Sequence, residues 1–392
     1  MNRTLNVGLI GGGGGKAFIV NPHHKALMMN GSRIVCAALH QDPEIAMKEA
    51  ENWPYPIRGW PNYTEMIEKE SKLSGNGTID YVLIVTPNNV HFDPAMKCVN
   101  AGFPVFCEKP LTTTVEEAHK LVQAVSKSNI PFGVAHTYLG HWSTLFSQFI
   151  ITSGLLGEVR RVNTYYWQGW LATALEETGQ QQAAWRTDPK QAGASCCGGD
   201  IGTHAFMQLR FVTGLEVETI LFAKLTTFVP GRQLDDNFTT ICELSNGAEA
   251  HICASQIMIG HKNDLGIEVN CGRGTLVWRQ EESEKVTIYL PGQPERVYWR
   301  GEVKPNDGFL GAVPEWLLSE PTLPSGHDEA FHDAFSRLHR FFGEDVRRYK
   351  EGKAPTYAGI RYAGVEDGLR HMEFIEAAIE CDKSGLPVEL PT

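Results

Sequence analysis

Leu5-Asn6-Val7-Gly8-Leu9-Ile10-Gly11-Gly12-Gly13-Gly14-Gly15 is an apolar run that leads directly into five consecutive glycines. The pattern predicts a buried first strand, a tight turn and then a helix over residues 22–30. Such a turn lets backbone N–H groups approach a pyrophosphate at the positive end of the helix. A mobile glycine loop is the alternative interpretation. The strand before the glycines and the helix after them favour nucleotide binding.

Two frames of the glycine run fit the dinucleotide-binding pattern. One uses Gly11, Gly13 and then Lys16, and the other uses Gly12, Gly14 and then Ala17. In each frame the second glycine lets the backbone approach the pyrophosphate. We expect the cofactor to contact the whole segment, namely Gly11, Gly12, Gly13, Gly14, Gly15, Lys16, Ala17 and Phe18.

The end of the second predicted strand, residues 33–39, bears on the choice of cofactor. An acidic residue at this place would bind the ribose 2′-hydroxyl of NAD. His40 is nearest to the strand end and Asp42 follows two residues later, although Asp42 before Pro43 fits a helix N-cap equally well. No arginine stands here to bind a 2′-phosphate, so NAD is favoured and NADP stays possible.

The following segments alternate between strand and helix patterns. Helices are predicted from residue 44 and over residues 63–72, 93–100 and 115–126, and strands over residues 79–85, 104–107 and 132–136. This alternation predicts an α/β domain with a doubly wound parallel sheet.

Charged and polar turns follow two of these strands. Cys107-Glu108-Lys109-Pro110-Leu111 comes after the strand over residues 104–107, and Thr86-Pro87-Asn88-Asn89-Val90-His91 follows the strand over residues 79–85. Open α/β sheets bind ligands at the carboxyl ends of their strands, so Lys109 is a candidate site residue. A surface turn with a solvated charge pair is the alternative.

A second candidate site lies at Asp200 and His204. Residues four apart on a helix project from one face, and a nearby carboxylate raises the basicity of an imidazole and orients it. The pair therefore suits a general base near neutral pH. A helix N-cap aspartate followed by a structural histidine is the alternative.

Composition limits the possible classes of protein. A chain of 392 residues predicts two domains, and the net charge of -11 argues against nucleic-acid binding. No signal peptide or membrane span is recognisable, which predicts a cytoplasmic protein without a membrane partner. The nine cysteines form no metal-binding spacing, so we expect no metal and buried, reduced thiols.

The second half of the chain is rich in strand patterns. They cover residues 160–167, 218–228, 239–244, 248–259, 266–271, 275–279 and 285–290. A large antiparallel sheet follows, and few helices are available to cover it. We therefore expect self-association through its uncovered face.

These motifs together resemble those of a known family. Gly11 to Gly15 followed by His24, Thr86-Pro87-Asn88 with His91, Ala101-Gly102 and Glu108-Lys109-Pro110 resemble the Gfo/Idh/MocA (glucose-fructose oxidoreductase/inositol dehydrogenase) family in order and spacing. Gly157-Glu158-Val159 resembles the start of its second domain, and Gly198 to His204 its Asp-x-x-x-His segment. Trp185-Arg186-Thr187-Asp188-Pro189 is most similar to the levoglucosan and inositol dehydrogenases of the family.

The resemblance implies a Rossmann domain, residues 1–137, and a substrate and oligomerisation domain with an open antiparallel sheet, residues 138–392. The helix over residues 365–383 is expected to pack back on the Rossmann domain. A homo-oligomer, dimer or tetramer, is implied. Lys109, Asp200 and His204 form the implied catalytic set. Further cofactor contacts are expected from His40, Asp42, Thr86, Pro87, Asn88, His91, Glu108, Lys109, Trp185 and Arg186.

The implied reaction is oxidation of a secondary hydroxyl of a sugar, glycoside or cyclitol, with His204 as base and Lys109 as hydrogen-bond donor. The opposite assignment of these two roles fits the same residues. Substrate contacts are expected from Lys109, His136, Tyr138, Tyr166, Arg186, Asp200, His204 and His327. Glycoside cleavage or epimerisation with a transient internal redox cycle is an alternative, and a non-enzymatic dinucleotide sensor is a weaker one.

Overall fold

The computed structural model describes residues 4–13, 18–75, 77–356 and 361–391. The chain forms two compact units. Unit 1 comprises Met1–Thr137 with Phe331–Met372, and unit 2 comprises Tyr138–Ala330 with Glu373–Thr392. The predicted second domain, 138–392, thus contains a segment, 331–372, that groups with unit 1.

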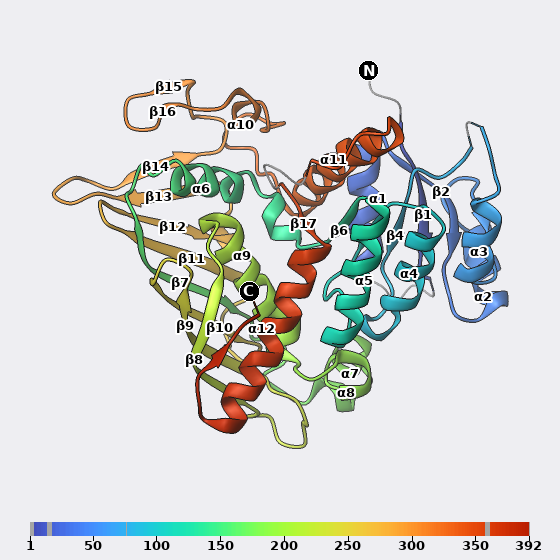
Figure 1. Cartoon of the computed structure of the whole chain (residues 1–392), viewed down its shortest axis with the longest axis horizontal. Helices are drawn as coiled ribbons and strands as arrows, with labels where there is room; N and C mark the ends of the chain where they lie inside the picture. The colour runs from blue at the N-terminus through green and yellow to red at the C-terminus, as the bar shows by residue number, and fades with distance from the viewer. Residues whose placement is uncertain (1–3, 14–17, 76, 357–360, 392) are drawn as a thin grey trace. The chain divides into compact units, whose positions relative to one another are not determined.

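Unit 1 is built on a mainly parallel sheet with the order β17-β6-β5-β4-β1-β2-β3 (Figure 1). Its strands are β1 (Asn6–Ile10), β2 (Arg33–Ala38), β3 (Arg58–Gly59), β4 (Tyr81–Ile84), β5 (Val105–Cys107), β6 (Phe132–Val134) and β17 (Ala363–Gly364). Only β17 is antiparallel to its neighbour within this described sheet. The strand order 3-2-1-4-5-6 is that of dinucleotide-binding folds, which confirms the predicted Rossmann sheet.

The helices of unit 1 alternate with its strands. They are α1 (Val20–Met29), α2 (Pro43–Glu51), α3 (Tyr63–Glu70), α4 (Phe92–Asn100), α5 (Val115–Ser128) and α11 (Phe331–Lys350), with a 3₁₀ turn η1 (Asn88–Val90). Side-chain oxygens of Asp42, Asn62 and Thr114 accept backbone N–H groups at the starts of α2, α3 and α5. These caps satisfy donors that the first helical turn leaves without a partner.

Helix α11 belongs to the core of unit 1 although it lies two hundred residues beyond the other helices in sequence. It packs on α1, and its Phe342 ring lies 5.1 Å from the ring of Phe106 on β5. Phe335, Leu338 and Phe342 are fully buried. Burial of each such side chain stabilises the fold by about 2 kcal/mol, so α11 is an integral part of this unit.

Unit 2 is built on a large, mainly antiparallel sheet with the order β14-β13-β12-β11-β7-β10-β9-β8-β18. Its strands are β7 (Val159–Trp167), β8 (Val217–Thr226), β9 (Asn237–Leu244), β10 (Glu249–Ser255), β11 (Asp264–Cys271), β12 (Thr275–Arg279), β13 (Lys285–Tyr289), β14 (Arg296–Trp299) and β18 (Val388–Glu389). β7 and β10 pair in parallel. The antiparallel second domain predicted from the strand patterns is confirmed.

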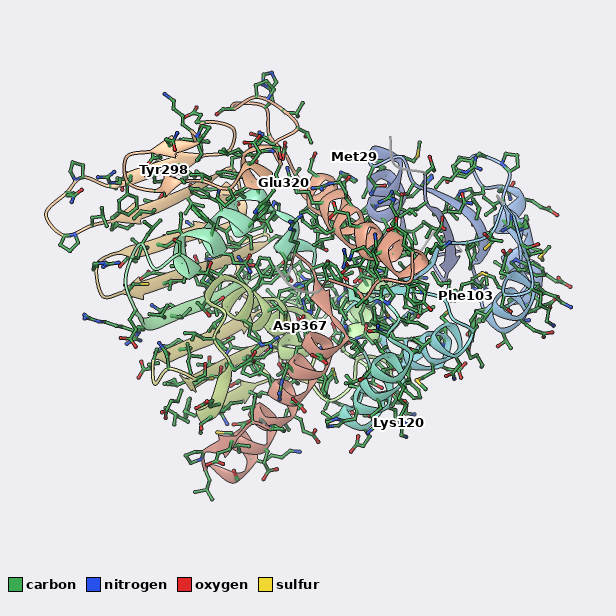
Figure 2. The ribbon with its side chains drawn as sticks, turned by 45° about the horizontal axis from the view of Figure 1, so that its top comes forward. Met29, Phe103, Lys120, Tyr298, Glu320 and Asp367 are labelled. Carbon is green, nitrogen blue, oxygen red and sulfur yellow. The ribbon has the colours of Figure 1, made fainter. Side chains whose placement is uncertain are left out.

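Helices α6 (Trp142–Thr152) and α9 (Thr203–Thr213) pack on this sheet, α6 against β12 and β13 and α9 against β7, β10 and β11 (Figure 1). Figure 2 draws the side chains of both units as sticks on the ribbon. The remaining elements are η2 (Thr137–Gly140), η3 (Leu175–Thr178), α7 (Gln181–Arg186), α8 (Pro189–Ala192), η4 (Gly198–Gly202), η5 (Gln280–Glu282), β15 (Asn306–Asp307), β16 (Gly311–Ala312), α10 (Glu315–Leu318) and α12 (Val365–Ser384).

Two further sequence expectations concern cysteines and membranes. All nine cysteines are free thiols, and seven of them are buried. Among the residues that the structure describes, no helix is both long and apolar enough to cross a bilayer.

Candidate functional site

The glycine turn follows β1 and lies against the end of β2. Gly11 and Gly12 both have φ of 92°, a conformation that glycine adopts without strain. The N–H of Gly13 donates to the carbonyl of Leu39 at 2.8 Å, and a Cβ on Gly13 would come within 2.7 Å of that oxygen. The backbone is therefore close-packed at the carboxyl end of the sheet. Gly14, Gly15, Lys16 and Ala17 lie outside the described residues, and Phe18 is exposed.

The residues after β2 support the alternative interpretation of Asp42, in which it is a helix N-cap. Oδ1 of Asp42 accepts the N–H groups of Glu44 and Ile45 at 2.9 and 3.2 Å, and Nδ1 of His40 accepts the N–H of Asp42 at 3.0 Å. Asp42 thus caps α2. Its predicted contact with a ribose is a separate matter and stays a prediction.

The turn that carries Lys109 is fixed by a buried histidine. Nδ1 of His91 lies 2.7 Å from the carbonyl oxygen of Pro110, and Nε2 lies 2.9 Å from that of Thr86. Burial lowers the pKa of His91, so the neutral ring donates one N–H. The imidazole joins the ends of β4 and β5, and with them the two polar turns predicted to lie at one sheet edge.

Glu108 and His136 are also buried in unit 1. Oε2 of Glu108 accepts the N–H of Lys109 at 3.2 Å, and Oε1 lies 2.9 Å from Nε2 of His23. Nε2 of His136 lies 3.2 Å from Nδ1 of His371 on α12. The predicted substrate residue His136 therefore has a histidine neighbour inside its own unit.

Asp200 lies on η4, a π-helical turn that runs into α9. Its Oδ2 accepts from Nε of Arg186 at 2.9 Å and from Nε2 of Gln256 at 3.0 Å. The Arg186 guanidinium also stacks on the Trp185 ring at 4.1 Å. The sequence predicts an ordinary helix here. A π turn holds more residues per turn and therefore changes how Asp200 and His204 are spaced around the helix. Such turns are frequent at functional sites.

The segment before Asp200 is held by a second, fully buried carboxylate. Oδ1 and Oδ2 of Asp235 accept the N–H groups of Cys196 and Gly198, each at 2.9 Å. A Cβ on Gly198 would come within 2.6 Å of the Phe238 ring, so glycine is required for this packing. Burial raises the pKa of Asp235. The π turn is thus built on buried partners.

His204 is buried among aromatic rings of unit 2. The Tyr138 ring meets it edge to face at 5.0 Å, and the Tyr166 ring lies at 5.9 Å. The two tyrosine hydroxyls are 2.5 Å apart, and Tyr166 also donates to Asn263 at 3.1 Å. Burial raises the pKa of Tyr138 to about 12, so it stays protonated near neutral pH. Three of the predicted substrate residues are therefore neighbours.

The predicted substrate contact of His327 stays a prediction. This residue lies ahead of α11, in unit 2, and is exposed. Its carbonyl accepts from the buried Arg300 at 2.5 Å.

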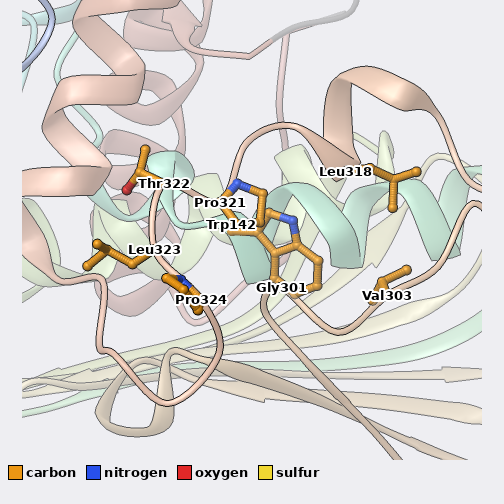
Figure 3. Close-up of a pocket in the computed structure, with 8 residues that line it drawn as sticks. All are labelled: Trp142, Gly301, Val303, Leu318, Pro321, Thr322, Leu323 and Pro324. Carbon is orange, nitrogen blue, oxygen red and sulfur yellow. The ribbon is translucent and has the colours of Figure 1, made fainter.

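A pocket of about 360 Å³ lies near this segment (Figure 3). It is lined by Trp142, Gly301, Val303, Leu318, Pro321, Thr322, Leu323 and Pro324, none of which is a predicted site residue.

Several residues around the candidate site are not recognisable from sequence. Gln256 and Asp235 lie on or next to strands 30 to 60 residues from the segment they hold, and His339 is on α11. A polar residue in or beside an apolar strand or helix pattern is the only sign of such a residue in the sequence. Its partner cannot be predicted, because the tertiary fold decides which residues meet.

Comparisons with known proteins agree with this architecture. Residues 5–136 match the oxidoreductase family model described as an NAD-binding Rossmann fold, and residues 148–277 match the GFO/IDH/MocA C-terminal domain. Levoglucosan dehydrogenase of Pseudarthrobacter phenanthrenivorans is 27% identical over 94% of this chain and 95% of its own.

Solved structures are also similar. An inositol dehydrogenase homolog from Azotobacter vinelandii, complexed with NAD+, has a TM-score of 0.90 at 28% identity and covers 99% of this chain and 98% of its own. An inositol dehydrogenase homolog from the same organism, complexed with NADH and myo-inositol, has a TM-score of 0.88 at 26% identity, with coverage of 99% and 98%.

Proposed function

Because the chain belongs to the GFO/IDH/MocA family of oxidoreductases, we propose that it oxidises a secondary hydroxyl of a sugar, glycoside or cyclitol. The product would be a keto sugar or a lactone. Two similar proteins are named for levoglucosan and for inositol, which supports a carbohydrate substrate. The family model describes an NAD-binding Rossmann fold, and NAD is the cofactor we assign.

The residues at the end of β1 fit a dinucleotide. Gly11, Gly12 and Gly13 carry no side chain where the backbone turns tightly against Leu39 and Val20. A pyrophosphate could approach such a backbone closely. Bound NAD would supply the acceptor for the hydride that leaves the carbinol carbon.

Side chains of the protein would accept the hydroxyl proton and stabilise the negative charge on the reacting oxygen. His204, as a neutral imidazole, would take the hydroxyl proton while the C–H bond breaks. Lys109 would donate a hydrogen bond to the same oxygen and stabilise the negative charge that develops there. Asp200 would position the substrate polyol. Lys109 belongs to unit 1, and Asp200 and His204 belong to unit 2.

The observation that carries the proposal is the environment of Asp200. Its Oδ2 is held by two side-chain donors, Arg186 and Gln256, on a π turn that leads into the helix of His204. A structural N-cap needs only backbone N–H groups. Two side-chain donors, one of them fully buried, are typical of a carboxylate whose orientation matters for a ligand.

The first test uses Lys109→Met and His204→Asn, with NAD and a panel containing levoglucosan, myo-inositol and glucosides. We expect turnover to fall about 100-fold or more for each, because each removes a group that acts on the reacting oxygen.

Lys97→Met and His251→Asn are matched controls, because both residues are half-buried and each pairs with a carboxylate on its own element. Near-normal turnover of a site variant would remove that residue from the mechanism. The absence of turnover by the unmodified protein on the whole panel would count against the proposed substrate class.

A further inference from the structure

A chain of four buried polar side chains runs through the core of unit 1. The Tyr81 hydroxyl lies 3.0 Å from Nδ1 of His339, and Nε2 of His339 lies 2.8 Å from Nδ1 of His23. Nε2 of His23 lies 2.9 Å from Oε1 of Glu108. The members come from β4, α11, α1 and the end of β5, and all are buried. Elements far apart in sequence therefore meet in one hydrogen-bonded series.

The surroundings of this series are apolar. The Phe335 ring lies 4.3 Å from the ring of His23, and the Phe106 ring lies 4.8 Å from that of His339. Because these side chains are buried, each polar atom depends on its neighbour in the series, since an unsatisfied buried polar group is costly. Loss of one member therefore affects the others.

The chemistry of the two ends gives the series a direction. When His23 is neutral, it donates through Nε2 to the Glu108 carboxylate and accepts through Nδ1. His339 then donates through Nε2. Burial and the proximity of His23 lower the pKa of His339 well below its usual value, so it carries one proton only. Its Nδ1 must accept, and the donor is the Tyr81 hydroxyl.

The series ends beside the proposed catalytic lysine. With Oε1 of Glu108 engaged by His23, Oε2 accepts the backbone N–H of Lys109 at 3.2 Å. A carboxylate held at one oxygen presents the other in a fixed direction. The orientation of the Lys109 backbone is therefore connected through Glu108 to Tyr81, on the neighbouring strand.

We propose that Tyr81, His339 and His23 are positioning residues that act through Glu108 to fix Lys109 for hydride transfer. The inference rests on the proposed function for the role of Lys109, but the hydrogen-bonded series itself does not. Nothing in the glycine motif or in the Glu-Lys-Pro turn requires a tyrosine and a second histidine behind them. The residues act at a distance, since none of the three is solvent-exposed.

The activity test compares Tyr81→Phe and His339→Leu with Tyr55→Phe. Tyr55 is a matched control because its hydroxyl also bonds a histidine, Nε2 of His24 at 3.0 Å, which is not part of the series. We expect kcat to fall about tenfold in both series variants, with the KM for NAD unchanged, because a misplaced catalytic group slows chemistry more than binding. His339→Gln, which can accept and donate, should recover part of the loss.

Equal kcat in Tyr81→Phe and Tyr55→Phe would overturn the proposal. So would a loss confined to the KM for NAD, or a His339→Gln variant no better than His339→Leu, because either result indicates a purely structural role.

A second readout needs no turnover and separates this inference from the proposed function. In protein labelled with ¹⁵N-lysine, the amide signal of Lys109 is assigned by its disappearance in Lys109→Arg. We expect Tyr81→Phe, but not Tyr55→Phe, to shift that signal, because the series ends on this amide. A shifted amide in a protein without sugar turnover would retain the series and reject the proposed function. An unmoved amide would reject the series whatever the activity.

Discussion

At the residue scale, the orientation of the Asp200 carboxylate is set by its hydrogen-bond donors. Gln256 is fully buried, its carbonyl accepts from the Cys196 thiol at 3.4 Å, and its amide donates to Oδ2 of Asp200 at 3.0 Å. The thiol contact fixes which end of the amide faces the carboxylate. Arg186 reaches the same oxygen from α7. The sequence indicates Asp200 and Arg186 as site residues but gives no sign that they are partners.

Gln256→Leu should lower kcat about tenfold, because the Asp200 carboxylate keeps Arg186 but loses its buried donor and its fixed direction. Gln208→Leu is the control: this glutamine is equally buried and donates to Thr144, outside the site. The assay uses whichever sugar or cyclitol the unmodified protein oxidises. Equal rates in the two variants would show that Asp200 needs no second donor.

At the element scale, the Rossmann elements are the most predictable part of the chain. The predicted helix over residues 93–100 is α4, Phe92–Asn100, and the predicted strand over residues 104–107 is β5, Val105–Cys107. Local patterns suffice there, because caps, apolar periodicity and turns agree. They fail at η4, where backbone bonds of Cys196 and Gly198 to Asp235 help to set a π turn that no local pattern encodes.

The imidazole of His91, which bridges the ends of β4 and β5, leads to a prediction about the pH dependence of stability. The pKa of His91 is lowered from 6.5 by burial, so the unfolded chain takes up a proton at a higher pH than the folded one. The stability that this ring contributes is therefore fully present above pH 6.5 and is lost as the pH falls through its lowered folded pKa.

His91→Gln should lower the free energy of unfolding by about 1 kcal/mol or more at neutral pH, because a buried hydrogen bond is weakened. The difference from the unmodified protein should shrink on acidification, since glutamine does not titrate. Denaturant unfolding at a neutral and a mildly acidic pH measures both values. A difference that grows as the pH falls would mean that the charged ring stabilises the fold by donating to both Thr86 and Pro110.

At the whole-molecule scale, the sequence predicts two domains and their fold classes, but not that α11, Phe331–Lys350, belongs to unit 1. The amphipathic pattern of α11 is visible in the sequence, yet no local signal says that Phe335 and Phe342 pack with α1 and β5 rather than with the nearer strands of unit 2. Tertiary partners of an apolar face are chosen by the whole core. Self-association through the sheet of unit 2 and a cytoplasmic location stay predictions.

The central claim is net hydride transfer from a carbinol to NAD, and the absorbance of reduced nicotinamide tests it most directly. Purified protein would be mixed with excess NAD and, in turn, with levoglucosan, myo-inositol and a set of glycosides. We predict that at least one of them gives reduced cofactor well beyond one equivalent of protein. A signal that stops at one equivalent, or that is present before NAD is added, would contradict net dehydrogenation and indicate a tightly held cofactor with an internal redox cycle.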